Sequence, residues 1–190
     1  MARWEPEPRE RLVRAALDLF AEQGYDTTTV VQIAERAGLT KSTFFRHFPD
    51  KREVLAAGQD TLCQLLSDGI AAASLSATPL EAVAAGLDAA AGAFVPERRD
   101  LGQKMQAAIA ASTELQEREV LKRVGLATAM TDALKKRGVP DPTASLAAEM
   151  GNLALKIAHT RWADPTNQHE LAALARQSLH ELQVASATLN

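Results

Sequence analysis

The sequence predicts an all-α protein of about nine helices. Hydrophobic residues make up 46% of the 190-residue chain but aromatic residues only 4%, and alanine accounts for much of the difference. Chains that are rich in alanine and poor in aromatic residues and glycine favour packed helices. Capping residues and helix breakers recur along the chain, and no segment alternates apolar and polar residues as a strand does. We therefore expect a chain built from helices alone, with short helices near the N-terminus and longer ones after residue 50.

Two of the short helices are expected over residues 30–37 and 41–47. A threonine that can cap precedes each helix, a glycine suited to the left-handed conformation follows the first, and a proline follows the second. In chain order these residues are Thr29 with its capping-box partner Gln32, Gly38, Thr40 and Pro49. Helices this short, joined by a tight glycine turn, are typical of DNA-binding helix-turn-helix units.

Longer helices follow, each bounded by a capping residue, a glycine or a proline. The capping pairs are Asp50 with Glu53, Thr78 with Glu81, and Asn167 with Glu170. The expected helices cover about 51–74, 79–94, 97–111, 114–137, 142–163 and 168–185, with Pro96 after the second of them. Residues 1–7 are expected to be mobile, with Arg3 and Trp4 disordered rather than in a minor groove.

The outer side of the second short helix is the candidate DNA-reading surface. Phe44 and Phe48 are four residues apart and are expected to pack inward on the first short helix. The side chains left outside are Lys41, Ser42, Thr43, Phe45 and Arg46, which are types that bond guanine, bond several base edges or touch the thymine methyl. Hydroxyl and cationic groups at the helix ends are expected to meet phosphates, and these are Thr29, Thr40, His47 and Lys51. The alternative is an ordinary helical corner with a solvated polar face.

The distribution of charge agrees with a local DNA site. The formal net charge is −3, which by itself does not indicate a protein that binds nucleic acid. Segment 40–52, however, holds four basic residues and one acidic residue, namely Lys41, Arg46, Lys51, Arg52 and Asp50. A positive patch on an acidic protein fits DNA contact without general adhesion to polyanions.

Residues 9–55 resemble the DNA-binding domain of the TetR family of transcriptional regulators. The matching residues are Leu12, Ala16, Phe20, Gly24, Tyr25, Thr29, Ile33, Ala34, Ala37, Gly38, Thr43, Phe45, His47, Phe48 and Lys51. The family usually has a tyrosine in place of Phe45, so apolar contact or packing is expected there, and often a basic residue in place of Val31. The resemblance implies a DNA-binding domain over 1–50, a helical ligand-binding and dimerisation domain over 51–190, and a regulator that mostly represses.

The last two helices carry stripes that suit pairing with a second copy of the chain. Small residues on one helix permit close approach, and the other has a broad apolar stripe. The interface candidates are Ala147, Gly151, Ala154, Ala158, Leu171, Leu174, Ser178 and Leu182. The alternative is that both stripes face only the chain's own core, but the resemblance implies a homodimer through these helices. Two recognition helices related by a twofold axis would read a palindromic operator.

The middle helices offer apolar residues interrupted by polar ones, as the wall of a small-molecule cavity would. The pocket candidates are Cys63, Leu66, Phe94, Met105, Ile109, Met130, His159 and Trp162. The alternative is that these residues only fill the core. Segment 114–137 and the Arg161–Trp162 pair resemble members of the family with acyl-CoA-like ligand domains, which implies a small, mostly apolar effector.

Other functional classes have less support. The four histidines lack the helical spacing of a metal-binding pair, a single cysteine makes no internal disulfide, and no GxSxG or glycine-rich phosphate motif occurs. A ligand-binding or scaffolding protein with a non-functional helix-turn-helix is the alternative, but such a protein would be expected to lose Lys41, Arg46 or Lys51. No apolar run reaches the roughly 20 residues of a membrane helix. We expect a cytoplasmic regulator that is not an enzyme, uses no cofactor or metal and binds double-stranded DNA.

Overall fold

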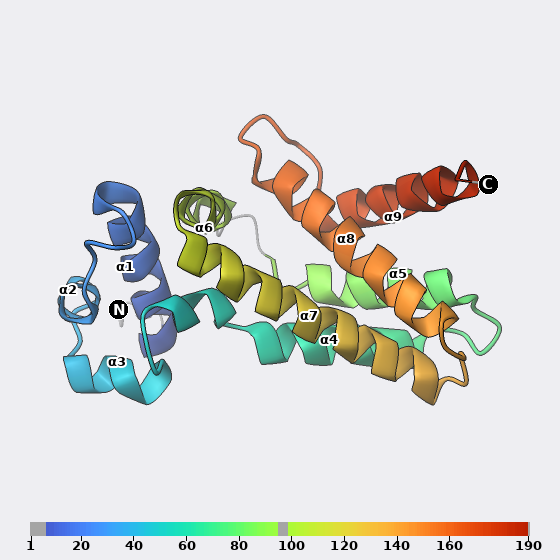
Figure 1. The fold of residues 1–190 in the computed structure, drawn as a ribbon, viewed down its shortest axis with the longest axis horizontal. Helices are drawn as coiled ribbons and strands as arrows, with labels where there is room; N and C mark the ends of the chain where they lie inside the picture. The colour runs from blue at the N-terminus through green and yellow to red at the C-terminus, as the bar shows by residue number, and fades with distance from the viewer. Residues whose placement is uncertain (1–6, 95–98, 190) are drawn as a thin grey trace, which may run out of the picture. The chain divides into compact units, whose positions relative to one another are not determined.

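The computed structural model describes residues 7–94 and 99–189, and these residues form nine α-helices, one 3-10 helix and no strand (Figure 1). The elements are α1 (Pro8–Gln23), α2 (Val30–Arg36), α3 (Lys41–His47), η1 (Arg52–Ala56), α4 (Gln59–Ala72), α5 (Pro79–Ala91), α6 (Arg99–Ala111), α7 (Thr113–Lys136), α8 (Thr143–Ala163) and α9 (Leu171–Ala187). The all-α class expected from the sequence is confirmed. Arg3, Trp4 and Pro96 lie outside the described residues. Within those ranges, no helix is both long and apolar enough to cross a membrane.

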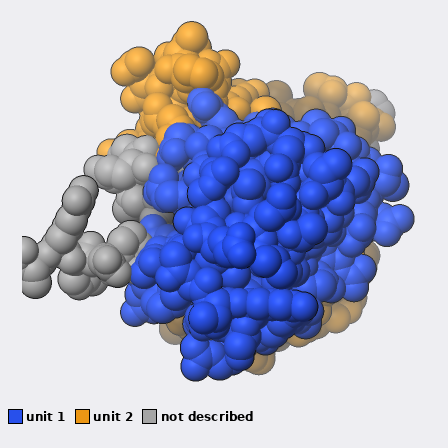
Figure 2. Space-filling model, turned by 90° about the vertical axis from the view of Figure 1, so that its left-hand side faces the viewer, with its two compact units in different colours: residues 1–57, 100–120 blue, residues 58–99, 121–190 orange. Residues whose placement is uncertain are grey.

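Contacts among the helices divide the chain into two compact units (Figure 2). Unit 1 comprises Met1–Ala57 and Asp100–Val120, and unit 2 comprises Gly58–Arg99 and Leu121–Asn190. The division into domains at residue 50 stays a prediction. The packing units are cut elsewhere because α6 and the first turns of α7 share a core with the N-terminal helices.

The core of unit 1 joins helices that are too short to be stable alone. Its fully buried members include Leu12, Leu17, Ile33, Phe44 and Leu55, contributed by α1, α2, α3 and η1. α6 and α7 add Leu101, Ala108 and Leu115 to the same cluster. Isolated helices of seven residues are unstable in water, so α2 and α3 depend on this shared burial.

Local hydrogen bonds hold α2 and α3 where the sequence predicts them. The Thr29 hydroxyl accepts from the backbone N–H of Gln32 at 3.3 Å, and the Gln32 carboxamide oxygen accepts from the Thr29 N–H at 2.8 Å. These two bonds complete the expected capping box. The Thr40 hydroxyl accepts from the Thr43 N–H at 3.1 Å and so caps α3. Between the two helices, Gly38 turns the chain with a φ of +65°.

The single helix expected over residues 51–74 is wrong. The Asp50 carboxylate accepts from the N–H groups of Arg52 and Glu53 at 3.0 and 3.1 Å, but the Glu53 side chain bonds elsewhere, so the capping box is only half formed. A 3-10 turn follows, and Gly58 then has a φ of +79°. Because a left-handed residue cannot continue a right-handed helix, α4 begins only after Gly58.

Unit 2 is built from α4, α5, α8, α9 and the remainder of α7 around one apolar core. α5 begins with the expected capping box, in which Thr78 accepts from the Glu81 N–H at 3.3 Å and Glu81 accepts from the Thr78 N–H at 2.7 Å. α9 differs, since its N-cap is Glu170 without a side-chain bond. The expected cap by Asn167 is wrong because its amide group bonds the backbone of His169 instead.

Two glycines allow α4 and α5 to cross closely inside unit 2. A Cβ atom on Gly69 would lie 2.7 Å from the Ala85 carbonyl oxygen and 2.7 Å from the Gly86 Cα. A Cβ atom on Gly86 would lie 2.8 Å from the Leu66 carbonyl oxygen. Backbone atoms cannot rotate away as a flexible side chain can, so the crossing requires glycine at both positions.

Gly69→Ala is expected to lower the free energy of unfolding by about 1–3 kcal/mol, the usual cost of overpacking a core. Gly92→Ala is the matched control, because Gly92 is exposed at the end of α5 with a φ of −61° and its nearest contact would be 3.4 Å away. Urea unfolding followed by circular dichroism measures both. Equal stability of the two variants would contradict the close crossing.

Candidate nucleic-acid interface

The outer side of α3 presents a compact set of side chains to solvent. Phe44 and Phe48 are 0% and 2% exposed, and their ring centroids lie 5.6 Å apart. Two inward residues fix the rotation of a short helix, so the opposite side faces outward. The exposed side chains there are Lys41, Ser42, Phe45 and Arg46. The inward rotation of the two phenylalanines agrees with the sequence prediction.

Phe45 is an apolar group among these polar ones. Its side chain is 48% exposed, so packing does not account for it. The ring meets Phe44 edge-on at 5.6 Å, and the Lys41 ammonium lies 5.9 Å from its centroid. Contact with the core fixes one edge of the ring and leaves the rest available to a partner. An apolar surface of this kind suits the thymine methyl group in a major groove.

A chain of polar contacts orders the other residues of α3. The hydroxyl oxygens of Thr40 and Thr43 lie 3.0 Å apart, and an Arg46 guanidinium N–H donates to the Thr43 hydroxyl at 3.2 Å. Thr43 is half-buried, whereas Thr40 and Arg46 are exposed. A guanidinium has five N–H donors, so this bond still leaves Arg46 able to make a bidentate contact with guanine.

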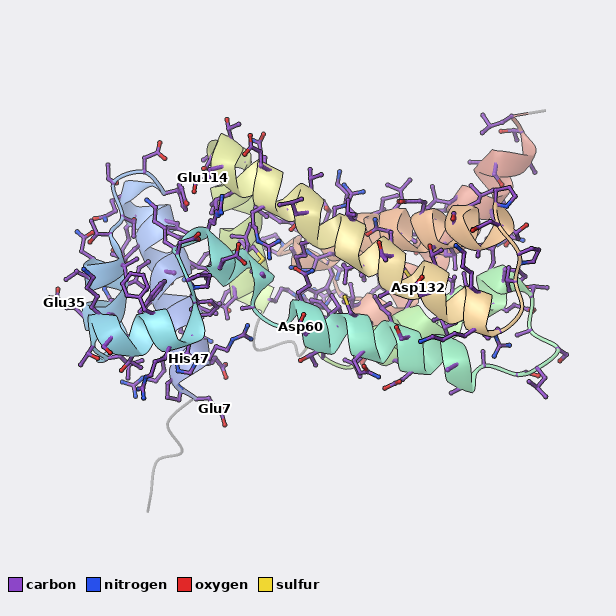
Figure 3. The ribbon with its side chains drawn as sticks, turned by 60° about the horizontal axis from the view of Figure 1, so that its bottom comes forward. Glu7, Glu35, His47, Asp60, Glu114 and Asp132 are labelled. Atoms are coloured by element: carbon purple, nitrogen blue, oxygen red, sulfur yellow. The ribbon has the colours of Figure 1, made fainter. Side chains whose placement is uncertain are left out.

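The remaining candidates lie at the helix ends. Thr29 is exposed at the start of α2, although its hydroxyl is engaged in the capping box. Val31, in the first turn of α2, is 41% exposed. His47 is half-buried in the last turn of α3 (Figure 3). These positions suit contacts with phosphates on either side of the base-reading surface.

Lys51 has an internal role that the sequence did not predict. Its ammonium donates to the carbonyl oxygens of Tyr25, Thr28 and Asp26 at 2.7, 3.0 and 3.3 Å, and it lies 4.1 Å from the centre of the Tyr25 ring. An ammonium has three N–H donors, so a phosphate would have to compete with these carbonyls. The contact joins the end of α3 to the turn that precedes α2.

Arg9 was missed by the sequence analysis. It is exposed in the first turn of α1, and its guanidinium carbon lies 5.2 Å from the centre of the Phe48 ring. This stacking adds a positive charge near the end of α3. An arginine at the start of a helix carries no sequence signal for such a contact, because the partner is far along the chain.

The pocket candidates do not form one group. Met105 and Ile109 pack on the core of unit 1, whereas the other six candidates belong to unit 2. Leu66 and Met130 are fully buried core residues. Two surface hollows lie on unit 1, and none of the eight candidates lines either of them. That the candidates line an effector pocket stays a prediction.

An aromatic cluster gathers three of the candidates in unit 2. The rings of Phe94, His159 and Trp162 have pairwise centroid distances of 5.7, 6.1 and 5.9 Å. The Arg99 guanidinium carbon lies 5.2 Å from the Trp162 ring, and one of its N–H groups donates to the Asn167 carbonyl at 2.9 Å. Burial lowers the pKa of His159 to about 4, with a smaller contribution from the nearby charge of Lys122. His159 is therefore neutral at pH 7.

Two further observations concern the reactivity of side chains in the described residues: the environment of the single cysteine and the arrangement of possible metal ligands. Cys63 is half-buried, its thiol lies 3.8 Å from the Gly125 carbonyl oxygen, and burial raises the pKa of the thiol. Within residues 7–94 and 99–189, no three side chains of His, Cys, Asp or Glu are arranged to hold a metal ion.

The stripes expected to form a dimer interface face the core of the same chain. Seven of the eight candidates are buried, and Leu182 is partly buried. The buried ones are Ala147, Gly151, Ala154, Ala158, Leu171, Leu174 and Ser178. A Cβ atom on Gly151 would clash with Val83 and lie 3.2 Å from the Met130 sulfur, so the small residues permit close packing within unit 2. Their burial within one chain matches the alternative that the stripes face the chain's own core, and their role in a dimer interface stays a prediction.

Lys51→Met is expected to lower the free energy of unfolding by about 1–3 kcal/mol, because it leaves carbonyl oxygens without their charged donor. Lys41→Met is the matched control, since it removes a lysine from the exposed face of α3 and is expected to change stability by less than about 0.5 kcal/mol. Thermal unfolding at low and high salt measures both effects. Two equally stable variants would refute the structural role of Lys51.

Comparison with known proteins agrees with this N-terminal site. The sequence profile of the bacterial regulatory proteins of the tetR family matches residues 12–57. The HTH-type transcriptional regulator TcmR of Streptomyces glaucescens is 37% identical over 84 residues, which are 44% of this chain and 37% of TcmR. The chain thus spans well under half the length of this curated relative.

Solved structures match over nearly the whole chain. FadR of Thermus thermophilus, a TetR family transcriptional repressor in complex with lauroyl-CoA, has a TM-score of 0.57 at 23% identity, covering 92% of this chain and 93% of FadR. FadR of Bacillus subtilis, in complex with stearoyl-CoA, has a TM-score of 0.61 at 20% identity, covering 90% and 95%. At these identities the likeness concerns the fold. Residues 12–57 thus match the tetR family of bacterial regulatory proteins, and the chain as a whole shares the fold of these solved structures.

Proposed function

We propose that this protein is a sequence-specific transcriptional regulator that binds a palindromic operator as a homodimer and represses until a small, mostly apolar effector binds. The observation that carries the proposal is the exposed face of α3, on which Lys41, Ser42, Phe45 and Arg46 stand together over a buried phenylalanine pair. Cationic, hydroxyl and apolar groups on one short helix match the donor, acceptor and methyl pattern of a major groove. The family of the matching region supports this reading.

A second copy of the chain has a suitable surface on the outer face of α8. Leu146 and Leu153 are 64% and 39% exposed, and Met150 and Ile157 are half-buried. The four residues follow one another at intervals of four, three and four, which is the spacing of a helix-pairing seam. A twofold axis through this seam would relate two α3 helices, which could then read half-sites about one helical turn apart.

The effector is proposed to bind in unit 2. Two structural neighbours were solved with acyl-CoA molecules, which supports a ligand with a long apolar part. In this chain, the cluster of Phe94, His159 and Trp162 offers aromatic surface, and Arg99 beside it offers a positive charge. A ligand that favours one of two conformers would shift their populations and so change the affinity for DNA.

Selection from a randomised duplex library is expected to recover a palindrome with the wild-type protein. The double variant Lys41→Ala/Arg46→Ala should lose this enrichment, since each good base contact contributes about 1–3 kcal/mol of discrimination. Arg176→Ala is the matched control, because Arg176 is an exposed arginine of unit 2 that pairs with Asp88 at 2.5 Å.

The same selection also distinguishes the proposed regulator from a ligand-binding or scaffolding protein. If the folded wild-type protein enriches no sequence, before and after denaturation, washing and refolding to remove any bound ligand, the proposal fails. A ligand-binding or scaffolding protein with a non-functional helix-turn-helix would then be the better description.

Leu146→Glu/Leu153→Glu is expected to convert the dimer to a monomer, because four charges would meet across the twofold seam. Both leucines are exposed within the chain, so the fold should persist. Leu75→Glu is the control, since Leu75 is fully exposed outside the helices. Sedimentation velocity measures the mass. A double variant that stays dimeric would reject this seam.

A further inference from the structure

The DNA-reading unit includes a segment far away in the sequence. α6 and the first turns of α7 contribute Leu101, Ala108 and Leu115 to the core that also holds α1, α2 and α3, and Met105 and Ile109 pack against it. Asp100–Val120 clusters with the N-terminal helices for this reason. The helix-turn-helix therefore packs against segment Asp100–Val120, which is called the wall below. This segment lies outside the matched region 12–57.

A first polar contact fixes this wall to the turn that precedes α2. The Tyr25 hydroxyl donates to a Glu114 carboxylate oxygen at 2.7 Å, and Tyr25 is only 5% exposed. Burial raises the pKa of Tyr25, and the bond to Glu114 raises it further, so the phenol keeps its proton and remains a donor. The Tyr25 carbonyl in turn accepts from Lys51, which links Glu114 to the end of α3.

A second contact fixes the wall to the segment that follows α3. The Arg118 guanidinium donates to both carboxylate oxygens of Glu53 at 2.8 and 2.9 Å. The side chains are 13% and 24% exposed, so water screens this pair less than a surface pair. Paired N–H···O bonds between arginine and a carboxylate also restrict orientation, because both groups are planar. Glu53 belongs to η1, five residues beyond Phe48.

Other contacts between α1 and α6 are less suited to setting orientation. Lys104 pairs with Asp18 at 2.6 Å and Arg14 with Asp100 at 3.5 Å, but these side chains are 27–49% exposed. Exposed pairs contribute little and are screened by salt. The two contacts made by α7 are therefore the ones that restrain the segment before α2 and the segment after α3.

We propose that Glu114 and Arg118 are positioning residues for DNA reading. They hold Tyr25 and Glu53, the residues that flank the α2–α3 pair, and so set the direction in which α3 presents its outer face. This proposal rests on the proposed function. On this proposal, the DNA-reading unit extends to the start of α7. Operator affinity and the preferred half-site spacing then depend on residues that do not touch DNA.

The test measures operator dissociation constants at fixed salt, on the selected palindrome and on versions with the half-sites moved by one and two base pairs. Glu53→Gln is expected to weaken binding to the best operator about tenfold, within the usual range of coupling between separate sites, and to reduce discrimination between spacings. Tyr25→Phe, which removes one hydroxyl, should act in the same direction. The exchange Glu53→Arg/Arg118→Glu should recover affinity to within about threefold, because it restores the pair.

Controls separate positioning from stability. Arg176→Gln removes an ion pair of unit 2 and should leave affinity and spacing preference unchanged. All titrations are made at a temperature at which circular dichroism shows each variant to be folded. If Glu53→Gln does not fold, Tyr25→Phe and the exchanged pair carry the test by themselves.

The outcomes are distinct. Suppose the wild type binds the operator, and Glu53→Gln and Tyr25→Phe have the same affinity and spacing preference. The positioning role is then overturned, while the proposed function stays intact. A lower melting temperature without a change in affinity has the same meaning, since the contacts would then be only structural. A folded, ligand-free wild type that binds no operator rejects the proposed function, and this proposal with it.

Discussion

A seven-residue helix such as α3 has too few backbone hydrogen bonds to be stable alone, so it depends on burying Phe44 and Phe48 in the core of unit 1. The same burial decides which side chains face outward, because the positions around a helix are fixed relative to one another. The cap by Thr40 and the turn at Gly38 fix where the helix begins. Recognition chemistry on the outer face is thus a consequence of packing on the inner one.

Prediction from the sequence succeeded best for helix caps, which depend on residues close together in the chain. The boxes at Thr29 and Thr78 and the cap at Thr40 involve groups three residues apart, and all three formed. The sequence failed where a distant partner decides. Glu53 was expected to bond back toward Asp50, but Arg118, 65 residues away, takes its carboxylate. The sequence also carried no sign of the bonds from the Lys51 ammonium to carbonyls 23 to 26 residues away, while its expected contact with phosphate stays a prediction.

The small residues of α8 illustrate a different limit. Small side chains let another helix approach closely, whether it belongs to the same chain or to a second copy. Sequence alone could not choose between these two, and in the structure Ala147, Gly151 and Ala154 are buried within the chain. On the neighbouring face of the same helix, Leu146 and Leu153 are exposed and seven residues apart. One helix can therefore carry a stripe of small residues that packs inward and, about 100° around the helix, a second stripe of larger apolar residues.

α7 contributes to two cores, and this has a consequence for regulation. Leu115 packs in the core of unit 1, whereas Leu126, Met130 and Leu134 pack in that of unit 2, and the helix is continuous from Thr113 to Lys136. Another of the three connections between the units, the one between α3 and α4, is interrupted by the left-handed Gly58. Continuous helical hydrogen bonding resists local bending, whereas a glycine turn absorbs it. A ligand in unit 2 can alter DNA binding only through a difference in its affinity for two conformers. α7 is the element that contributes side chains both to the core of unit 2 and to the contacts made by Glu114 and Arg118.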